Sequence, residues 1–436
     1  MDIYVVQPGD TIDTIANKYG VTILKLILDN GLKNPYGLVP GQSIVITYPI
    51  QTHIVQEGDT LDSISRTYDI TFMQLLRNNS FLSDREYIYP GETLVISYDT
   101  DGKITTNGYV YPYINSETLM KTLPYLTYLS IFNHWITEEG ELLTSNDDIE
   151  IINIAKNYSV VPLMMLSSPS FIGDPTIEVI YKILSNEEYR DQIISDVLNI
   201  LKSSGYYGIN ILISGIDNSN QNAYIDLFTI VSNVLSNEGY QFFLTINPNI
   251  KTIDGSISYE RIDYSTISQL VDGIMFLQYV WGTNLGPPSP VSSISELTDF
   301  INYVVTLVPP DKLSVGEPII GYDWELPYIP GESRAYSLSI DSAILLAHEV
   351  GAIIEFDETS QTPFFKYKVT YTNTPIEHIV WFIDARSINA LGQLAANLSL
   401  SGSGVWNIMT YFQQLWTIFN SQYEIVKIIS DNLNNP

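Results

Sequence analysis

The first hundred residues repeat one pattern of hydrophobic and polar positions. VVQPGDTIDTIANKYGVTILKLILDNG starts at Val5 and IVQEGDTLDSISRTYDITFMQLLRNNS starts at Ile54, and a Pro-Gly pair with a short apolar run closes each copy. Within each copy, apolar residues recur at the spacing of one helical face after a possible Thr cap. The pattern predicts strand, helix, helix and strand, with Pro-Gly turning the chain into the last strand. We therefore expect two small βααβ modules, over residues 1–49 and 50–99.

From about residue 105 the pattern changes to short apolar runs that alternate with helical stretches, as in βα units. The predicted strands are residues 108–111, 126–132, 160–166, 208–213, 241–246, 273–279, 313–319 and 404–407. Eight such strands favour an α/β fold of the TIM (β/α)8 barrel type over residues 105–436. The interval before the last strand is too long for one helix. It predicts an α+β insertion at about 325–380.

The charge and the residue types narrow the classes of partner. A net charge of −29, from 49 acidic and 20 basic residues, argues against nucleic acid and anionic membranes as partners. With no Cys and four His that share no ligand spacing, we expect no metal and no other cofactor. No apolar run is long enough for a spanning helix, and the start, MDIYVVQPGD, shows no secretory signal pattern.

The two front segments resemble LysM modules. The matching residues are the V-x-x-G-D-T-[IL] start of each copy, an Asn after the second helix, and the Pro-Gly ending. The resemblance implies binding of glycans that contain N-acetylglucosamine, such as peptidoglycan or chitin. The implied contacts are Gly9, Asp10, Thr11 and Asn30 in the first copy, and Gly58, Asp59, Thr60 and Asn78 in the second. The alternative is that these residues only cap helices and form turns.

Aromatic residues lie where the predicted barrel strands end. In TIM barrels the ligand site is at the C-terminal ends of the strands. Those ends carry Trp135, Tyr279, Trp281, Asp323 with Trp324, and Trp406. Aromatic rings stack on the apolar faces of sugars, so we expect contacts with a glycan here. Ordinary core packing of the same rings is the alternative.

The large domain resembles family 18 glycoside hydrolases, and in particular spore cortex-lytic N-acetylglucosaminidases with two LysM modules. The segments GEPIIGYDWELPYIPG, VWFIDARSI and GVWNI carry this resemblance. It implies substrate-assisted hydrolysis, in which a Glu protonates the glycosidic oxygen and an Asp two residues earlier orients the acetamido group of the substrate. The family motif D-x-x-D-x-D-x-E falls on the fourth strand, where Tyr207, Asn210, Leu212 and Ser214 occupy its four acidic positions.

A hydroxyl group cannot act as a general acid near neutral pH, because its pKa is far too high. We therefore expect a non-catalytic glycan-binding protein of the outer spore layers, with peptidoglycan and other coat proteins as partners. One alternative is an active N-acetylglucosaminidase with a displaced acid such as Asp217, and Glu317, Asp323 and Glu325 are expected near the sugar hydroxyls. A purely structural coat protein is the other alternative.

Overall fold

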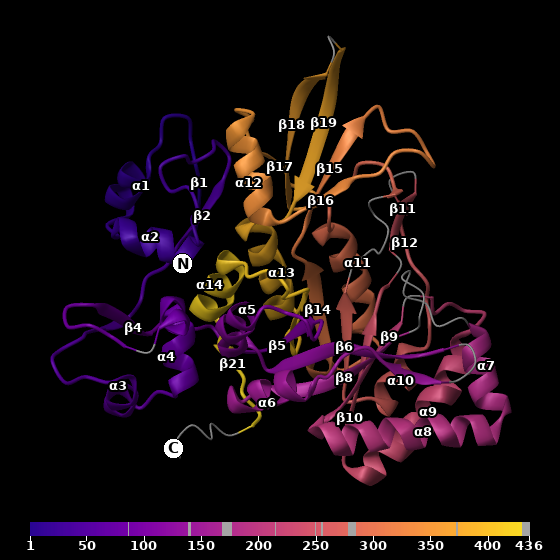
Figure 1. Cartoon of the computed structure of the whole chain (residues 1–436). Helices are drawn as coiled ribbons and strands as arrows, with labels where there is room; N and C mark the ends of the chain where they lie inside the picture. The colour runs from indigo at the N-terminus through magenta and orange to yellow at the C-terminus, as the bar shows by residue number, and fades with distance from the viewer. Residues whose placement is uncertain are drawn as a thin grey trace.

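Each N-terminal repeat folds as the predicted strand–helix–helix–strand unit in the computed structural model of the chain (Figure 1). The structure describes residues 1–85, 87–137, 141–167, 177–213, 215–248, 250–253, 256–277, 285–371 and 374–429. The first module consists of β1 (Asp2–Val5), α1 (Ile12–Tyr19), α2 (Ile23–Asn30) and β2 (Ser43–Ile46), and the second of β3 (Gln51–Ile54), α3 (Leu61–Tyr68), α4 (Phe72–Asn78) and β4 (Thr93–Ser97). Each module buries its own apolar cluster, so each has a separate core.

The loop before the first helix of each module has the predicted capping chemistry. Thr11 and Thr60 accept a hydrogen bond from the backbone N–H three residues later, and both form a complete capping box. Gly9 and Gly58 both have φ of +90°, a conformation that side chains disfavour. The Gly-Asp-Thr sequence therefore has a structural reason in both modules.

A closed barrel of parallel strands follows the modules, which confirms the predicted fold class (Figure 1). In the described part of the chain its eight strands are β5 (Lys103–Val110), β6 (Tyr128–Ile136), β8 (Val161–Ser167), β9 (Gly208–Ile213), β10 (Gln241–Ile246), β13 (Gly273–Leu277), β14 (Leu313–Pro318) and β20 (Gly402–Trp406). Neighbouring strands pair in parallel, and the pairing of β20 with β5 closes the ring. Each predicted strand corresponds to one of these.

Helices surround the barrel and cover its outer face. They are α5 (Ser116–Thr122), α6 (Ile149–Asn157), α7 (Ile177–Ser185), α8 (Glu187–Ile200), α9 (Gln221–Glu238), α10 (Tyr264–Leu270), α11 (Ile294–Val304), α13 (Ala385–Asn397) and α14 (Gln413–Gln422). Short additional strands are β7 (Leu142–Thr144), β11 (Lys251–Ile253), β12 (Ser256–Ser258) and β21 (Glu424–Ile425). The main apolar core lies between these helices and the outer faces of the barrel strands.

The predicted insertion is present between β14 and α13, at the top of Figure 1. It contains β15 (Gly321–Leu326), β16 (Tyr336–Leu338), α12 (Ile340–Glu349), β17 (Glu355–Asp357), β18 (Thr362–Tyr371) and β19 (Thr374–Phe382). The strands form an antiparallel sheet in the order β16–β15–β19–β18–β17. Its first strand begins a few residues earlier than the sequence indicated.

One helix of the barrel, α14, joins both modules to the large domain. Gln414 and Thr417 donate to the first module, to the side chain of Asn30 and to the carbonyls of residues 43 and 29. Gln413 accepts from Ser80, and Asn420 bonds Arg77 and residue 78 of the second module. Polar residues at helical spacing along α14 thus contact the two modules in turn.

The first module also contacts the insertion and α13. The N–H of Ile354 donates to the carbonyl of Pro40 at 2.9 Å. Arg386, which is paired with Asp384, donates to the carbonyl of Gly41 at 3.1 Å. A Cβ at Gly41 would lie 1.8 Å from the carbonyl oxygen of Ile354, and φ there is +87°. Only glycine permits this close approach.

Candidate functional site

The lumen of the barrel contains a chain of neutral hydrogen-bonding groups. Thr245 donates to Oδ1 of Asn210 at 2.9 Å, so the hydroxyl of Tyr109 must donate to Thr245, at 2.6 Å. Nδ2 of Asn210 donates to Ser130, and Ser130 donates to Oδ1 of Asn107. Asn210 stands where the family resemblance places an acidic residue, and it ties three strands together through uncharged groups.

Leu212 lies on the same face of β9 as Asn210, two residues further along the strand. It is buried in an apolar cluster within the lumen. The other members are Tyr109, Phe132, Met165, Met275, Leu277 and Trp406. The register of β9 therefore agrees with the predicted lumen-facing position of Leu212. Ser214, the last position of the motif, lies outside the described residues.

Tyr207 and Asp217 lie at the two ends of the β9 segment. Tyr207 precedes the strand and is 41% exposed. Asp217 follows it, on the loop before α9, and its Oδ1 accepts from the hydroxyl and N–H of Ser219 and from the N–H of Asn220. The hydrogen bond from the Ser219 side chain lowers the pKa of Asp217. Asp217 is thus held as an anion at the C-terminal side of the barrel.

Two of the predicted aromatic contacts lie in packed surroundings. Trp406 is 7% exposed, and its ring contacts Tyr109 and Phe132 with centroids 5.6 and 4.9 Å apart. Trp324 is 1% exposed in the core of the insertion, and its Nε1 donates to the carbonyl of Gly286. In this conformation Trp324 offers no free ring face to a sugar. Tyr279 and Trp281 lie outside the described residues.

Asp323 is bonded within the insertion, and Glu317 points away from the lumen. Both oxygens of Asp323 are bonded within the insertion, Oδ1 to Nδ1 of His378 at 3.0 Å and Oδ2 to the hydroxyl of Tyr367 at 2.6 Å. Glu317 pairs in register with Val405, which belongs to the outer core, whereas the next pair contains the lumen residue Trp406. Because side chains alternate along a strand, Glu317 faces the helices and not the sugar site that we expected.

Trp135 reaches the mouth of the barrel because β6 contains a bulge. The register with β8 shifts between Phe132 and His134, so Trp135 is opposite Ser167 and shares the lumen face with Phe132. Trp135 is half-buried. This position suits the predicted contact with a sugar ring.

A buried polar network holds this bulge. Oδ2 of Asp148 accepts from Nδ2 of Asn133 at 2.8 Å, from Nε2 of His134 at 2.9 Å, and from the hydroxyl of Tyr206. Burial opposes the ionisation of Asp148, but the bonds from His134, Tyr206 and Asn133 outweigh it and lower the pKa of Asp148. Sequence reasoning missed Asp148, whose partners come from two other segments of the chain.

The predicted LysM residues divide into exposed loop residues and buried supports. Gly9, Thr11, Gly58 and Thr60 are exposed, and Asp10 and Asp59 are bonded at the loop base. Oδ2 of Asp10 accepts from Tyr4 and the N–H of Gln7, while Oδ2 of Asp59 bonds His53 and the N–H of Gln56. The hydrogen bond from Tyr4 lowers the pKa of Asp10, so the first loop carries a negative charge.

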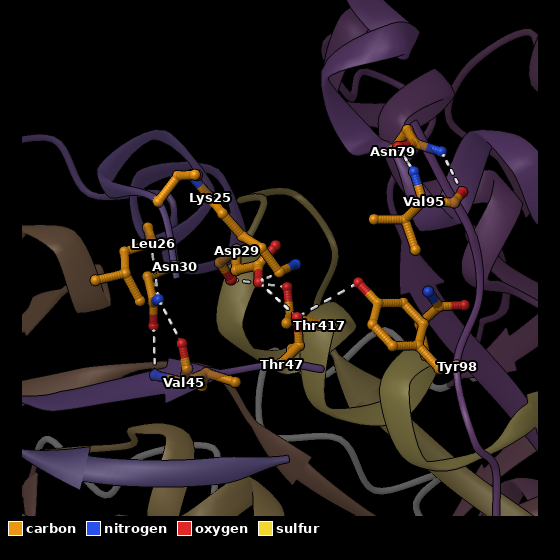
Figure 2. Close-up of polar contacts among 12 residues, drawn as sticks. Lys25, Leu26, Asp29, Asn30, Val45, Thr47, Asn79, Val95, Tyr98 and Thr417 are labelled. Carbon is orange, nitrogen blue, oxygen red and sulfur yellow. Dashed lines mark hydrogen bonds and ion pairs between the residues drawn. The ribbon is translucent and has the colours of Figure 1, made fainter. Parts of the chain in front are cut away.

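Asn30 is a buried support of the first module. It donates to the carbonyls of Leu26 and Val45 and accepts from the N–H of Val45 (Figure 2). Asn79 makes the same set of bonds to Leu75 and Val95 in the second module. Asn79, and not the predicted Asn78, is therefore the counterpart of Asn30.

Helix length and the grouping of ionisable side chains bear on a membrane span and on a metal site in the described ranges. No helix there is both long and apolar enough to span a bilayer. Within the same ranges, no group of three His, Asp or Glu side chains could hold a metal ion.

Comparisons with known proteins agree with this architecture. A model of the LysM domain matches residues 4–47 and 53–97, and a model of glycosyl hydrolases family 18 matches residues 167–410. The cortical fragment-lytic enzyme of Bacillus subtilis is 32% identical over 435 residues, which cover 98% of this chain and 99% of that protein. The enzyme of the same name from Bacillus anthracis is 30% identical over 438 residues, with 98% and 99% covered.

A crystal structure supports the same relationship. The Bacillus megaterium spore cortex-lytic enzyme SleL superimposes with a TM-score of 0.78 at 30% identity, covering 98% of this chain and 99% of that chain. These full-length relatives are named lytic enzymes. The prediction that the chain is not an enzyme is therefore wrong. That prediction rested on replaced motif residues alone, whereas the likeness extends over both modules and the whole barrel.

Proposed function

Because the chain belongs to family 18 of the glycosyl hydrolases, we propose that it hydrolyses an N-acetylglucosamine-containing glycan of the spore cortex, of the peptidoglycan type. One observation carries the proposal: the likeness to the cortical fragment-lytic enzyme covers 98% of the chain, both modules included. The proposed place of action is the bacterial spore, and the proposed partner is peptidoglycan.

Glycan binding by the two modules is the first part of this function. The exposed Gly-Asp-Thr loops, residues 9–11 and 58–60, are the proposed contacts. Inside each module, Asn30 or Asn79 holds the end of the second helix to the last strand. Two modules that both contact α14 raise the effective concentration of the barrel at a glycan surface. Weak single sites are then sufficient for stable attachment.

The chemistry is the second part. In substrate-assisted hydrolysis the acetamido oxygen of the sugar attacks C1, and an anion stabilises the positive charge that develops. We assign this anion to Asp217, whose low pKa keeps it ionised at the end of β9. Its charge suits stabilisation of a cation better than donation of a proton. With the leaving oxygen protonated by a hydronium ion from the solvent, we expect turnover about 10²–10⁴-fold below that of a site with a positioned acid.

The test uses the full-length chain and purified cortex fragments. New reducing ends are measured by reduction with borohydride and mass spectrometry between pH 4 and pH 8. We expect release by the wild type, rising toward low pH, and at least about a tenfold loss in Asp217→Asn. Asp226→Asn, an exposed change on α9, is the matched control and should keep the wild-type rate.

A double substitution tests the assignment of the lumen. Leu212→Asp with Ser214→Glu should raise the rate, because it supplies the orienting Asp and the proton-donating Glu of the family motif. If Asp217→Asn releases reducing ends at the wild-type rate, the role of Asp217 is overturned but the proposed hydrolysis is not. No release by the wild type at any pH, together with release by the double variant, would overturn the proposed hydrolysis.

A further inference from the structure

A cavity of about 330 Å³ lies between the first module and the large domain. Its walls come from the end of α2 with the loop after it, from α12 of the insertion, and from the start of α14. Figure 1 shows α12 beside the first module and α14 below it. The volume is in the range of about 300–1,000 Å³ that is usual for ligand pockets. None of its lining residues belongs to the barrel lumen.

The walls of this cavity combine apolar and polar groups. Leu32, Leu345 and Phe412 supply apolar faces, and Asn34 and Ser342 supply hydrogen-bonding groups. A sugar has apolar ring faces, an acetyl methyl group and hydroxyls around its edge, which match such a mixture.

The charges at the edge of the cavity favour a neutral ligand. Lys33 from the module and Asp341 from α12 both line it, and their opposite charges interact. Their net contribution is close to zero, so neither an anion nor a cation is selected. An acidic peptide is therefore a poorer match than an uncharged saccharide.

Gln414 provides a polar group without a partner at this cavity. Its Nε2 donates to Asn30 and to the carbonyl of Ser43, which fixes the orientation of the amide. Its Oε1 is buried and has no hydrogen-bond donor in the described part of the chain. Native structures leave few buried polar atoms unpaired. The N–H of an acetamido group is a donor of the kind that this oxygen lacks, and it reaches the oxygen only if the cavity wall moves aside, because the oxygen is closed to solvent in this conformation.

We propose that this cavity binds an N-acetylated saccharide, so that one glycan strand is held jointly by the first module and the insertion. The proposal rests on the proposed function for the class of its ligand. It goes beyond that function because it gives the first module a second role. The module then forms one wall of a binding site and does not only attach the enzyme to its substrate.

The test measures hydrogen–deuterium exchange of the full-length chain with and without triacetylchitotriose, which is a binding readout independent of hydrolysis. We expect slower exchange in residues 30–37 and also in residues 341–348. Leu345→Arg places a long charged side chain at the cavity, so the concentration that gives half of this protection should rise at least about tenfold. Glu349→Arg, on α12 but outside the cavity lining, should leave it unchanged.

Three results would overturn the proposal. Protection of residues 30–37 without residues 341–348 would place the saccharide on the module alone. Protection only in residues 58–79 or in the barrel would leave the proposed hydrolysis standing and remove this site. Protection of both segments by triglutamate, but not by the saccharide, would assign the cavity to an acidic peptide. If the saccharide protects both segments but the wild type releases no reducing ends from cortex fragments, this binding site stands and the proposed hydrolysis is wrong.

Discussion

Gln414 and Asn30 are hydrogen-bonded across the boundary between the barrel and the first module, with 3.0 Å between Nε2 of Gln414 and Oδ1 of Asn30. The same Nε2 lies 2.8 Å from the carbonyl oxygen of Ser43. Both Gln414 and Asn30 are buried, so neither bond competes with water. The contact links Asn30, which holds α2 to β2 inside the first module, to α14, which also contacts the second module.

Gln414→Leu should loosen the first module while the second stays in place. It removes two buried hydrogen bonds and leaves the carbonyl of Ser43 without a partner, a loss of about 1–3 kcal/mol at this interface. We expect faster hydrogen exchange in residues 43–46. The matched control is Asn420→Leu, which removes the bonds to Arg77 and residue 78 and should change exchange in the second module only. Equal effects of both variants on both modules would contradict this division.

Asn79→Ala should destabilise the second module far more than Asn78→Ala. Asn79 makes three bonds that join α4 to β4, whereas Asn78 donates to the carbonyl of residue 96 and accepts from Asn420. Loss of the buried Asn79 set leaves the Val95 backbone unpaired and should cost about 2–4 kcal/mol. Thermal unfolding of the two variants measures the difference, and similar midpoints would contradict the equivalence of Asn79 with Asn30.

The barrel strands could be predicted from the sequence because their signal is local. The bounds of β9 and β10 agree with the prediction at both ends, since each is an apolar run with turn residues on either side. The counterpart of Asn30 was also within reach. The Gly-Asp-Thr loops are 49 residues apart, and the same offset leads from Asn30 to Asn79.

The attachment of the modules could not be predicted in this way. Gln413, Gln414, Thr417 and Asn420 are polar residues at helical spacing, a pattern that normally indicates an exposed face. Their partners are more than 300 positions away in the chain. The network at Asp148 has the same difficulty, because it joins three segments whose proximity appears only in the folded barrel.

Asp148→Asn should lower stability and displace Trp135. One oxygen of Asp148 accepts three hydrogen bonds, and the uncharged amide weakens all of them, at a cost of about 2–4 kcal/mol. The pKa of Asp148 is lowered, so its contribution is present above the pKa of the unfolded chain and is lost as the pH falls through the folded value. Unfolding of wild type and variant should therefore converge at low pH.

Asp147→Asn is the control for that change, since Asp147 is exposed and bonds only the N–H of Ile149 in the described residues. Trp135 fluorescence, read in a background where the other tryptophans are replaced by phenylalanine, should shift in Asp148→Asn and not in the control. An unshifted emission with reduced stability would limit Asp148 to a structural role remote from the barrel mouth.

We expect the wild type to lose stability as the pH rises because of Glu317. The Glu317→Gln variant should not show this part of the loss. Glu317 is buried behind β14, its Oε2 has no partner in the described residues, and burial with the nearby Asp384 raises its pKa to about 8 from an ordinary value of 4.5. Between these two pH values the unfolded chain has released the proton and the native chain retains it. The free energy of unfolding then falls by about 1.4 kcal/mol per pH unit through this group.

Chemical denaturation between pH 4.5 and pH 8 measures this slope. The Glu317→Gln variant keeps a neutral side chain of the same shape, so its stability should match the wild type near pH 4.5 and exceed it increasingly toward pH 8. The matched control, Glu325→Gln, removes an exposed carboxylate on β15 and should leave the wild-type slope in place. Parallel pH profiles of the wild type and Glu317→Gln would show that Glu317 is ionised in the native state, against the burial described for it.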